Sequence, residues 1–444
     1  KPNLAFYDRK YRNVLKAIMK YAREKHPELL LILDAKRGDI FDTQEFYADA
    51  DMANFAPDVM TINSYMGHKA TLEPYYKKDD KICAFSLAAT SNPDTEVQEM
   101  WTASGIKVYQ AMALENRKAA PDRTGLVVGS TKTAAARNIR AAELEEGYKE
   151  GTEAWFLAPG FGKQGGDLSF VKFAGPKALY PISSGLVNPK YLDGTTPLEA
   201  VIKWKNAIND AGERFEMRSI SERLVSDLND NGLIWTAESA DETTWRVLKS
   251  GIMSPIFFEM QKFQAYPDMM KSCVYLLQKK LWQAGLIWKE EIDKKTVVKY
   301  AFDFVAGVPE GGTVLGGNLA YGLNMPCVTI RKETKDHGQG GDYVALWKDG
   351  GGSWRPGKRA LLVEDVATSG GSVLEKVRKM RADGLEVEDA IVIVDREQGA
   401  KANLAAEGVK LHSMFTALEA VEKLPEENNM RRVILNYMAK SIIK

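Results

Sequence analysis

The sequence predicts an α/β protein with two different α/β domains, of which the first is a TIM (β/α)8 barrel. The chain has 444 residues, which corresponds to two or three domains of ordinary size. Short apolar runs alternate with longer patterns of helical period, and this alternation indicates parallel sheets. A charged segment over residues 209–222 has little apolar periodicity and separates two alternating regions. We therefore expect one domain over residues 1–212 and a second over residues 213–444.

Six apolar runs precede this boundary, and each is expected to form a buried strand. Three intervening stretches, at residues 9–23, 44–53 and 96–117, have the periodicity of helices. Repeated strand–helix units indicate a parallel sheet, either open or closed into a barrel, and in a parallel barrel the chemistry lies at the carboxyl ends of the strands. A closed barrel needs eight strands, so we expect two more upstream of Lys1. The six runs lie at residues 29–33, 59–62, 82–87, 125–128, 154–157 and 179–182.

The second region repeats the alternation with a different spacing and different glycine positions, so the two halves are not an internal repeat. Helical patterns cover residues 220–231 and 269–284. Its expected strands lie near residues 302–305, 327–331, 360–364 and 390–394.

The composition excludes several classes of protein. Lysine plus arginine and aspartate plus glutamate both number 60, which gives a net charge of zero. This balance argues against nucleic acid or an anionic membrane as the main partner, and no apolar run approaches the ~20 residues of a membrane span. The three widely spaced cysteines and four histidines form no zinc pattern and fit a reduced compartment. We expect a cytoplasmic protein.

The end of the apolar run at residues 360–364 carries the strongest chemical signal. Two adjacent acids, Glu364 and Asp365, suit a sugar diol or a hydrated Mg²⁺ ion. A small-residue loop then opens a helix, where glycines allow close approach and free N–H groups attract phosphate. The spacing is not that of a Walker loop, and an ordinary strand–turn–helix corner is the alternative. The loop residues are Thr368, Ser369, Gly370, Gly371 and Ser372.

Residues 360–372 resemble the phosphoribosyl-diphosphate (PRPP) motif of type I phosphoribosyltransferases. The resemblance implies that Glu364 and Asp365 bind the ribose hydroxyls and that the loop after them binds the 5′-phosphate. It also implies that Mg²⁺ arrives on PRPP near these two acids, with no direct protein ligand.

Three further segments resemble orotate phosphoribosyltransferase, and the resemblance extends over about residues 220–443. Lys249, Phe257 and Phe258 lie in a stretch similar to the one that seats orotate against an aromatic ring. Arg396 follows the expected strand 390–394, where the resemblance assigns it to the orotate carboxylate, a natural partner of a guanidinium.

The third segment, residues 331–341, is polar and ends in glycines, which predicts a mobile loop. As a bare charge run it would be a solvated loop. Its similarity to the family's catalytic loop implies closure over diphosphate, with the cations stabilising the departing charge. These cations are Arg331, Lys332, Lys335 and His337.

Charged residues follow the first apolar run of the barrel. Asp34 and Lys36 are two positions apart, so we expect both side chains on one face, at the end of the barrel that carries the chemistry. An acid and a base in a half-buried pocket are costly unless structure or function needs them. Spacing alone leaves a salt-bridged barrel rim as the alternative.

The D-x-K-x-x-D-I pattern resembles orotidine 5′-monophosphate (OMP) decarboxylase, a family that uses an Asp–Lys network and no cofactor. The resemblance implies that Lys36 protonates the pyrimidine C6 as carbon dioxide leaves, while Asp34 faces the substrate carboxylate. Asp39 would reach into the neighbouring subunit's site, so that activity requires a dimer. Lys1 matches the other lysine of the network, and Thr43 also falls at a family position.

Contacts to phosphate are expected in the loops after the last two strands. Gln164 matches the family's phosphate-contacting glutamine, and Gly165 follows it. After the last strand the family offers an arginine, whereas this chain has Ser184 and Gly185. Serine can donate a hydrogen bond but carries no charge, which puts phosphate affinity in doubt. Ser91 lies in a segment similar to the loop that touches the pyrimidine, although a Ser-Asn-Pro turn is its simpler interpretation.

The two resemblances share a metabolite. The second domain would convert orotate and PRPP to OMP and diphosphate, and the first would convert OMP to UMP and carbon dioxide. The pair resembles the UMP synthase family of bifunctional enzymes, with the domains in reversed order. Because both component families form dimers with shared sites, we expect a homo-oligomer, either a dimer or a tetramer.

Two alternative functions remain at this stage. One is an orotate phosphoribosyltransferase with a catalytically impaired barrel, motivated by the serine in place of arginine. The other is a non-enzymatic PRPP-binding regulator. Some protist fusions are directed to a peroxisome-like organelle by a C-terminal tripeptide, and this sequence ends Ile442-Ile443-Lys444, which is not such a signal. That location would require a tripeptide trimmed from this sequence.

Overall fold

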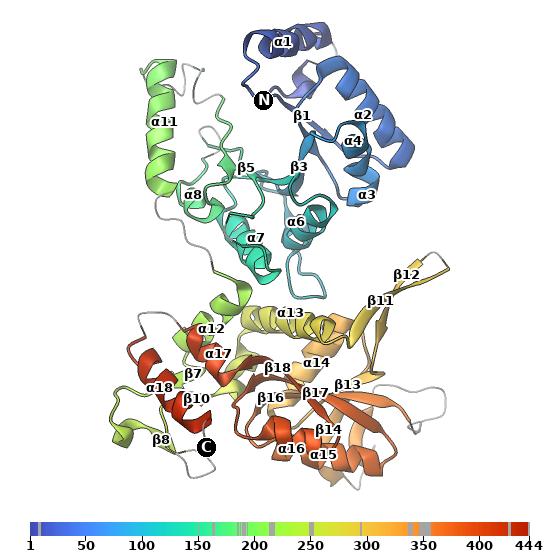
Figure 1. Cartoon of the computed structure of the whole chain (residues 1–444), viewed down its shortest axis with the longest axis vertical. Helices are drawn as coiled ribbons and strands as arrows, with labels where there is room; N and C mark the ends of the chain where they lie inside the picture. The colour runs from blue at the N-terminus through green and yellow to red at the C-terminus, as the bar shows by residue number, and fades with distance from the viewer. Residues whose placement is uncertain are drawn as a thin grey trace. The chain divides into compact units, whose positions relative to one another are not determined.

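The computed structural model describes residues 1–7, 10–149, 151–161, 165–183, 186, 188, 192, 194–212, 218–247, 253–293, 295–335, 341–345, 357–424 and 428–442. They form two compact units (Figure 1), one of Lys1–Met100 with Lys107–Ser219 and one of Trp101–Ile106 with Ile220–Lys444. The predicted boundary after residue 212 adjoins residues outside the described part, so its position stays a prediction.

The first unit is built on one parallel sheet in which each strand pairs with the next strand of the sequence. The sheet is curled like part of a TIM barrel, which confirms the predicted fold class, and its strands correspond to the six predicted runs. The strands are β1 (Ile32–Arg37), β2 (Val59–Ile62), β3 (Cys83–Ala89), β4 (Thr124–Val128), β5 (Phe156–Leu157) and β6 (Ala178–Leu179).

Helices cover the outside of this sheet (Figure 1). The single helix expected over residues 96–117 is wrong, because the chain turns through Gly105, at φ 81°, between two separate helices. The longer helices are α1 (Arg12–Lys25), α2 (Phe41–Phe55), α6 (Val108–Ala119), α7 (Thr133–Glu145) and α11 (Pro197–Gly212). The shorter ones are η1 (Leu4–Phe6), α3 (His68–Thr71), α4 (Glu73–Lys78), α5 (Glu96–Glu99) and α8 (Ser169–Ala174).

The two faces of the curled sheet bury different sets of side chains. Leu33 and Met60 pack with residues of the surrounding helices. The opposite face carries a layer to which each of β1–β5 contributes one residue: Ile32, Val59, Phe85, Val127 and Leu157. Because side chains alternate along a strand, positions two residues further on lie on this inner face, at the carboxyl ends of the strands. Asp34 and Thr61 occupy such positions in β1 and β2.

The first three residues run beside β1. Asn3 forms a parallel bridge with Asp34, and the Asp34 N–H donates to the carbonyl of Pro2 at 3.0 Å. This backbone pairing brings Lys1 to the carboxyl end of β1.

The second unit contains a six-stranded sheet in the order β15-β14-β13-β16-β17-β18, parallel except for β15. After β15 the chain crosses back to place β16 on the other side of β13, so the strand order reverses at β13. Ligands of open α/β sheets bind at the carboxyl ends of the strands beside such a reversal. The strands are β13 (Phe304–Gly307), β14 (Cys327–Lys335), β15 (Gly341–Ala345), β16 (Arg359–Ala367), β17 (Glu386–Asp395) and β18 (Lys410–Thr416).

Smaller elements complete the second unit. Three two-stranded sheets pair β7 (Ile234–Thr236) with β10 (Ile256–Phe258), β8 (Arg246–Val247) with β9 (Met253–Ser254), and β11 (Ile287–Ile292) with β12 (Lys295–Tyr300). The helices are η2 (Glu242–Thr244), η3 (Met260–Ala265), α12 (Ile220–Asp230), α13 (Pro267–Gln283), α14 (Gly311–Leu323), α15 (Gly371–Ala382), α16 (Ala400–Ala406), α17 (Ala417–Glu422) and α18 (Arg431–Ile442).

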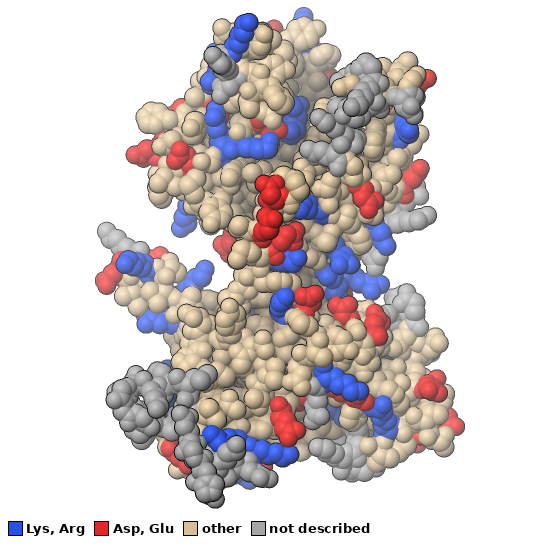
Figure 2. Space-filling model, turned by 180° about the vertical axis from the view of Figure 1, so that it is seen from behind, with Lys and Arg blue, Asp and Glu red and all other residues tan. Residues whose placement is uncertain are grey.

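Acidic and basic side chains are interspersed on the face drawn in Figure 2, in keeping with the zero net charge. Among the helices that the structure describes, none combines the length and the apolar character needed to cross a bilayer.

Candidate active sites

The Asp34 carboxylate lies between two lysine ammonium groups at the carboxyl end of β1. It accepts hydrogen bonds from Lys36 Nζ at 2.6 Å, from Thr61 Oγ1 at 2.9 Å and from Lys1 Nζ. Asp34 is only 4% exposed, whereas the Lys36 side chain is 46% exposed. Burial alone would raise the pKa of Asp34, but its hydrogen bonds with Lys1 and Lys36 outweigh burial and lower the pKa. A buried, ionised carboxylate therefore positions two ammonium groups, and the side chain of Lys36 is accessible from solvent.

The approach of Lys36 to Asp34 depends on an irregular strand. Lys36 has φ 47°, in the left-handed region, and the pairing of β1 with β2 shifts register between Leu33 and Arg37. The Lys36 N–H donates to Thr61 Oγ1 at 2.9 Å, so one hydroxyl contacts both members of the pair. The two side chains do meet, through a local bulge rather than the regular alternation expected. Thr61 was missed, although a threonine within an apolar run was a signal.

Asp39 and Thr43 lie where the chain enters α2. The Asp39 N–H donates to Gln44 Oε1 at 3.1 Å, and its carboxylate accepts from the N–H of Ile40 at 2.8 Å. Thr43 is exposed on the first turn of α2. The structure of one chain does not bring either side chain into the hydrogen bonds of Asp34 described above.

Two other candidate residues of this unit lie after β3 and β5. Ser91 is half-buried and packs closely on Gly129, where an added Cβ would stand 2.7 Å from that of Ser91. Gly165 has φ 71° and open space around it, which suits a loop that accepts a ligand. A Cβ on Gly166 would lie 2.2 Å from Ser130 Oγ, so the loop approaches the end of β4 closely.

In the second unit, Glu364 and Asp365 stand at the carboxyl end of β16, beside the strand-order reversal. Glu364 accepts from the Asp365 N–H at 3.1 Å and from Ser372 Oγ at 3.4 Å. Burial, and then the charge of Asp365, raise the pKa of Glu364 to about 8. The Asp365 carboxylate lies against Gly311, where an added Cβ would be 2.2 Å from Oδ2. Only glycine fits at this start of α14.

The acid pair offers carboxylate oxygens to a cation or to hydroxyl groups. In the part of the chain that the structure describes, no group of three metal-ligating side chains gathers. Two adjacent carboxylates, one with a pKa raised by burial and then by the charge of its neighbour, favour an approaching cation or hydroxyl donors. Glu364 and Asp365 therefore suit sugar hydroxyls and a hydrated Mg²⁺ ion.

The loop after β16 has the geometry of an anion site. Gly370 has φ 77° and caps the 12-residue helix α15, and a Cβ there would lie 3.3 Å from Ala400 Cα. The carbonyl of Thr368 accepts from the Ala400 N–H at 3.1 Å, and that of Ser369 accepts from Asn403 Nδ2 at 2.9 Å. Hydrogen bonds from α16 thus fix these two carbonyls. The side chains of Thr368, Ser369 and Ser372, together with Gly371, are exposed at the start of the helix.

Arg396 and the segment with the two phenylalanines meet in the structure, although they are 140 positions apart. Arg396 Nη2 donates to the carbonyl of Ile256 at 3.5 Å. Phe257 is half-buried, with the guanidinium of Arg246 at 5.5 Å from its ring centre. Phe258 points to the other side of β10 and is buried. Phe257 is therefore the ring of the pair that is open to a ligand.

The prediction of a mobile loop over residues 331–341 is wrong for the first half of this segment, which forms a strand. Arg331, Lys332 and Lys335 lie in β14, because β14 pairs antiparallel with β15 as far as Lys335 and Gly341. Local polarity did not reveal this non-local pairing. Lys332 Nζ donates to Glu310 Oε1 at 3.0 Å, which brings this cation to the residue just before α14.

A cavity of about 110 Å³ adjoins the acid pair. The apolar wall of this cavity was not predicted, because methionine and phenylalanine in η3 have the pattern of ordinary core residues. Its lining consists of Met260, Phe263, Gln264, Met270, Glu310, Gly311, Val314, Leu315, Asp365 and Ile393.

Several candidate residues lie outside the described part of the chain. They are Gln164, Ser184, Gly185, Lys249 and His337, together with the side chain of Lys335.

Comparison with known proteins finds one family in each unit of the chain, in the order predicted from the sequence. A model of the orotidine 5′-phosphate decarboxylase/HUMPS family matches residues 1–176, and a phosphoribosyl transferase domain model matches residues 284–421. The orotate phosphoribosyltransferase of Sulfolobus acidocaldarius is 34% identical over 203 residues, which cover 45% of this chain and 90% of that protein. The counterpart from Cenarchaeum symbiosum is 35% identical over 178 residues, 40% of this chain and 79% of that protein.

Two longer matches span both units. The bifunctional enzyme PyrF/PyrE of Nostoc sp. is 26% identical over 440 residues, which cover 96% of this chain and 84% of that protein. The solved structure of Leishmania donovani UMP synthase has 24% identity and a TM-score of 0.42, and covers 99% of this chain and 88% of that one.

The two family models and the curated relatives define a bifunctional enzyme in which a decarboxylase domain precedes a phosphoribosyltransferase domain. The chain belongs to the orotate phosphoribosyltransferase family through its second unit, and its first unit is an orotidine 5′-phosphate decarboxylase domain. The resemblances seen in the sequence are thereby confirmed, including the order of the domains.

Proposed function

We propose that the residues described above carry two consecutive reactions, in which the second unit makes OMP and the first unit decarboxylates it. The observation that supports this best is the buried Asp34 carboxylate held between Lys1 and Lys36. A charged triad at the carboxyl end of barrel strands is the place and the chemistry that decarboxylation without a cofactor needs.

In the first unit, Lys36 stabilises the carbanion and then protonates it. The bond from C6 to the carboxylate breaks, its electron pair stays on C6, carbon dioxide leaves, and the Lys36 ammonium delivers a proton to C6. Asp34, ionised because of its two lysine partners, faces the substrate carboxylate. Like charges brought together there favour loss of carbon dioxide, although ground-state destabilisation is a debated account. Gly165 with Gln164 binds the phosphate, and Ser91 binds the pyrimidine.

In the second unit, orotate displaces diphosphate from PRPP. Glu364 and Asp365 bind the ribose hydroxyls, and the loop from Thr368 to Ser372 binds the 5′-phosphate. Mg²⁺ bound to PRPP would lie near the two acids, where it would neutralise charge on the departing diphosphate. Arg396 pairs with the orotate carboxylate, and Phe257 stacks on its ring.

The cations of β14 and of the residues after it serve the leaving group. Lys332 Nζ donates to Glu310, and the next residue, Gly311, lies against the Asp365 carboxylate. Arg331 and Lys335 lie in the same strand, β14, and we assign His337 to the same role from the sequence. Together they would stabilise the negative charge that develops on diphosphate as the glycosidic bond forms.

We further propose a cytoplasmic homo-oligomer, a dimer or a tetramer, whose sites are shared between subunits. Asp39 lies on an entry loop flanked by exposed apolar residues, Ile40 at 49% and Phe41 at 64% exposure. An apolar surface beside an acid whose carboxylate accepts from the neighbouring backbone N–H supports docking of a second copy.

The test is release of labelled carbon dioxide from carboxyl-labelled orotate, with PRPP and Mg²⁺ present. We expect release that requires PRPP, because orotate must first become OMP. Consumption of orotate without release would leave a working transferase and refute the decarboxylase role. OMP given directly separates the two steps, since it needs only the first unit.

A further inference from the structure

The segment that carries Lys36 adopts a backbone conformation that requires support from its surroundings. Lys36 and Phe41 have φ values of 47° and 39°, which residues with a Cβ rarely adopt. Between them, Gly38 packs so closely on Asn63 that an added Cβ would lie 2.8 Å from its carbonyl oxygen. Such a segment persists only where neighbouring contacts determine its course.

A buried carboxylate behind the segment supplies one such contact. Asp51, on α2, is fully buried and accepts two hydrogen bonds from Arg37, from Nε at 3.0 Å and from Nη2 at 3.1 Å. Tyr75, on α4, donates its hydroxyl to the same carboxylate at 3.0 Å. Burial, and then the charge of Asp51, raise the pKa of Tyr75, so the phenol stays protonated and keeps donating.

A buried amide supplies a second contact. Gln44 is fully buried; its Oε1 accepts from the Asp39 N–H at 3.1 Å, and its Nε2 donates to the carbonyl of Thr71 at 2.7 Å. Arg37 and Asp39 are therefore both tied to the outer helices, one position and three positions after Lys36. None of these four side chains is among the groups assigned to substrate.

We propose that Arg37, Asp51 and Tyr75, with Gln44, are positioning residues for decarboxylation. They fix the backbone at Lys36 so that its ammonium stays on Asp34 and close to the reacting carbon. A bidentate arginine–carboxylate pair has a fixed planar geometry, which makes it suited to holding a backbone segment in one place. The inference rests on the proposed decarboxylase function and adds residues that act through Lys36.

The positioning role predicts a specific kinetic signature. A shift of Lys36 by about 1 Å leaves the substrate contacts intact but moves the proton donor, and such misplacement costs on the order of 100-fold in rate. In the full-length chain, Asp51→Asn keeps the shape of the side chain and removes the charge that holds Arg37. We expect kcat for OMP decarboxylation to fall about 10- to 100-fold, with KM changed less than about twofold.

Two further variants make the test specific. Tyr75→Phe removes one hydrogen bond to Asp51 and retains the ring, so we expect a smaller fall in kcat, about two- to fivefold, in a chain that still folds. Glu143→Gln alters another fully buried carboxylate that pairs with arginines, on α7 of the same unit. It should lower the melting temperature but leave kcat per folded chain within about twofold of the unmodified value.

All rates are measured at temperatures below the unfolding transition of each variant. Orotate consumption by the second unit, measured in the same sample, gives the amount of active chain present. Unchanged kcat in both Asp51→Asn and Tyr75→Phe would overturn the inference, as would an equal fall in Glu143→Gln. An unmodified chain that cannot decarboxylate OMP would instead refute the proposed function itself.

Discussion

A buried carboxylate stays ionised where attraction to nearby cations exceeds the cost of removing the carboxylate from water. Asp34, between Lys1 and Lys36, is such a case. Its folded pKa is lowered, so the charge contributes stability above the ordinary pKa, and that contribution is lost as the pH falls through the lowered value. Lys36 serves both this charge balance and the proposed proton transfer. Removing it therefore has consequences for both stability and rate.

Lys36→Ala is expected to abolish release of carbon dioxide from OMP, because it removes both the proton donor and a stabilising charge. General acid catalysis alone is worth about 10²- to 10⁴-fold. Orotate consumption by the second unit should continue unchanged. Lys20→Ala, at an exposed lysine of α1 that pairs with Glu24, is the matched control. Residual decarboxylation near the unmodified rate in Lys36→Ala would contradict the assignment.

Glu364 presents the opposite electrostatic case. Burial and the charge of Asp365 raise its pKa from 4.5 to about 8, so the folded chain holds a proton that the unfolded chain releases between these values. Stability then falls as pH rises through this window, because the folded state binds more protons.

In the ligand-free chain, we expect the unfolding transition of the second unit to shift to lower temperature between pH 5 and pH 8. The glutamine in Glu364→Gln cannot ionise, so the melting temperature of this variant should change less over this range. The difference in melting temperature between the variant and the unmodified chain should therefore grow in favour of the variant as the pH rises. Calorimetry at several pH values measures this, with Glu242→Gln as an exposed control. Parallel pH curves for the unmodified chain and Glu364→Gln would contradict the raised pKa.

The sequence predicted which charged residues lie together at the ends of β1 and β16, but it did not predict their backbone conformations. Asp34 and Lys36 could be paired from spacing, and Glu364 and Asp365 from the loop that follows them. The left-handed φ of Lys36 could not be predicted, since lysine has no preference for that region. The contact of Arg37 with Asp51 joins two elements, and no local pattern indicates which buried acid an arginine meets.

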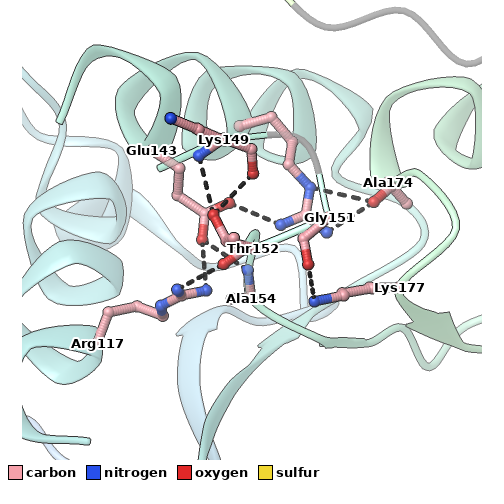
Figure 3. A network of polar contacts seen from close by, with 9 residues as sticks. Arg117, Glu143, Lys149, Gly151, Thr152, Ala154, Ala174 and Lys177 are labelled. Carbon is pink, nitrogen blue, oxygen red and sulfur yellow. Dashed lines mark hydrogen bonds and ion pairs between the residues drawn. The ribbon is translucent and has the colours of Figure 1, made fainter. Parts of the chain in front are cut away.

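At the scale of elements, a second buried charge network ties α6, α7 and the loop before β5 together (Figure 3). Glu143 accepts from Arg117 at 3.1 Å, from Arg140 at 2.6 Å and from the N–H of Ala154 at 2.9 Å. Arg140 also donates to the carbonyl of Ala174, and Arg117 to that of Thr152 at 2.8 Å. One carboxylate thus organises two helices and the chain that leads into a barrel strand.

Glu143→Gln should destabilise the first unit, because both arginines are buried and lose their counter-charge. Breaking a buried pair costs about 3–5 kcal/mol, and the glutamine, which retains one acceptor, should lie near the lower end. Thermal or denaturant unfolding measures the loss as an earlier transition of the first unit only. A change below about 1 kcal/mol would show that the network contributes little.

The elements themselves were predicted to different degrees. The six strands of the first unit could be predicted because buried parallel strands are short apolar runs. Residues 331–335 were expected in a loop, because their polarity hides a pairing with β15 that depends on distant residues. The break between α5 and α6 also escaped notice, since one glycine in an otherwise helical pattern is a weak signal.

At the scale of the whole molecule, fusing the two units makes one chain supply and consume the same intermediate in fixed proportion. Zero net charge gives no general attraction to the anionic intermediate, so its capture depends on the local cations of each site. We proposed above that one acid, Asp39, reaches the decarboxylase site of a partner chain.

Shared decarboxylase sites can be tested by mixing two inactive chains. In a dimer of Lys36→Ala with Asp39→Ala, one site carries both changes and the other carries neither. Random pairing makes about half of all dimers mixed, and half of their sites are intact, so about one quarter of the unmodified activity should return. Carbon dioxide release is measured before and after mixing, with orotate consumption as the control in every sample. Sites complete within one chain would give no recovery at any mixing ratio, and the exposed apolar side chains beside Asp39 would then need a different partner.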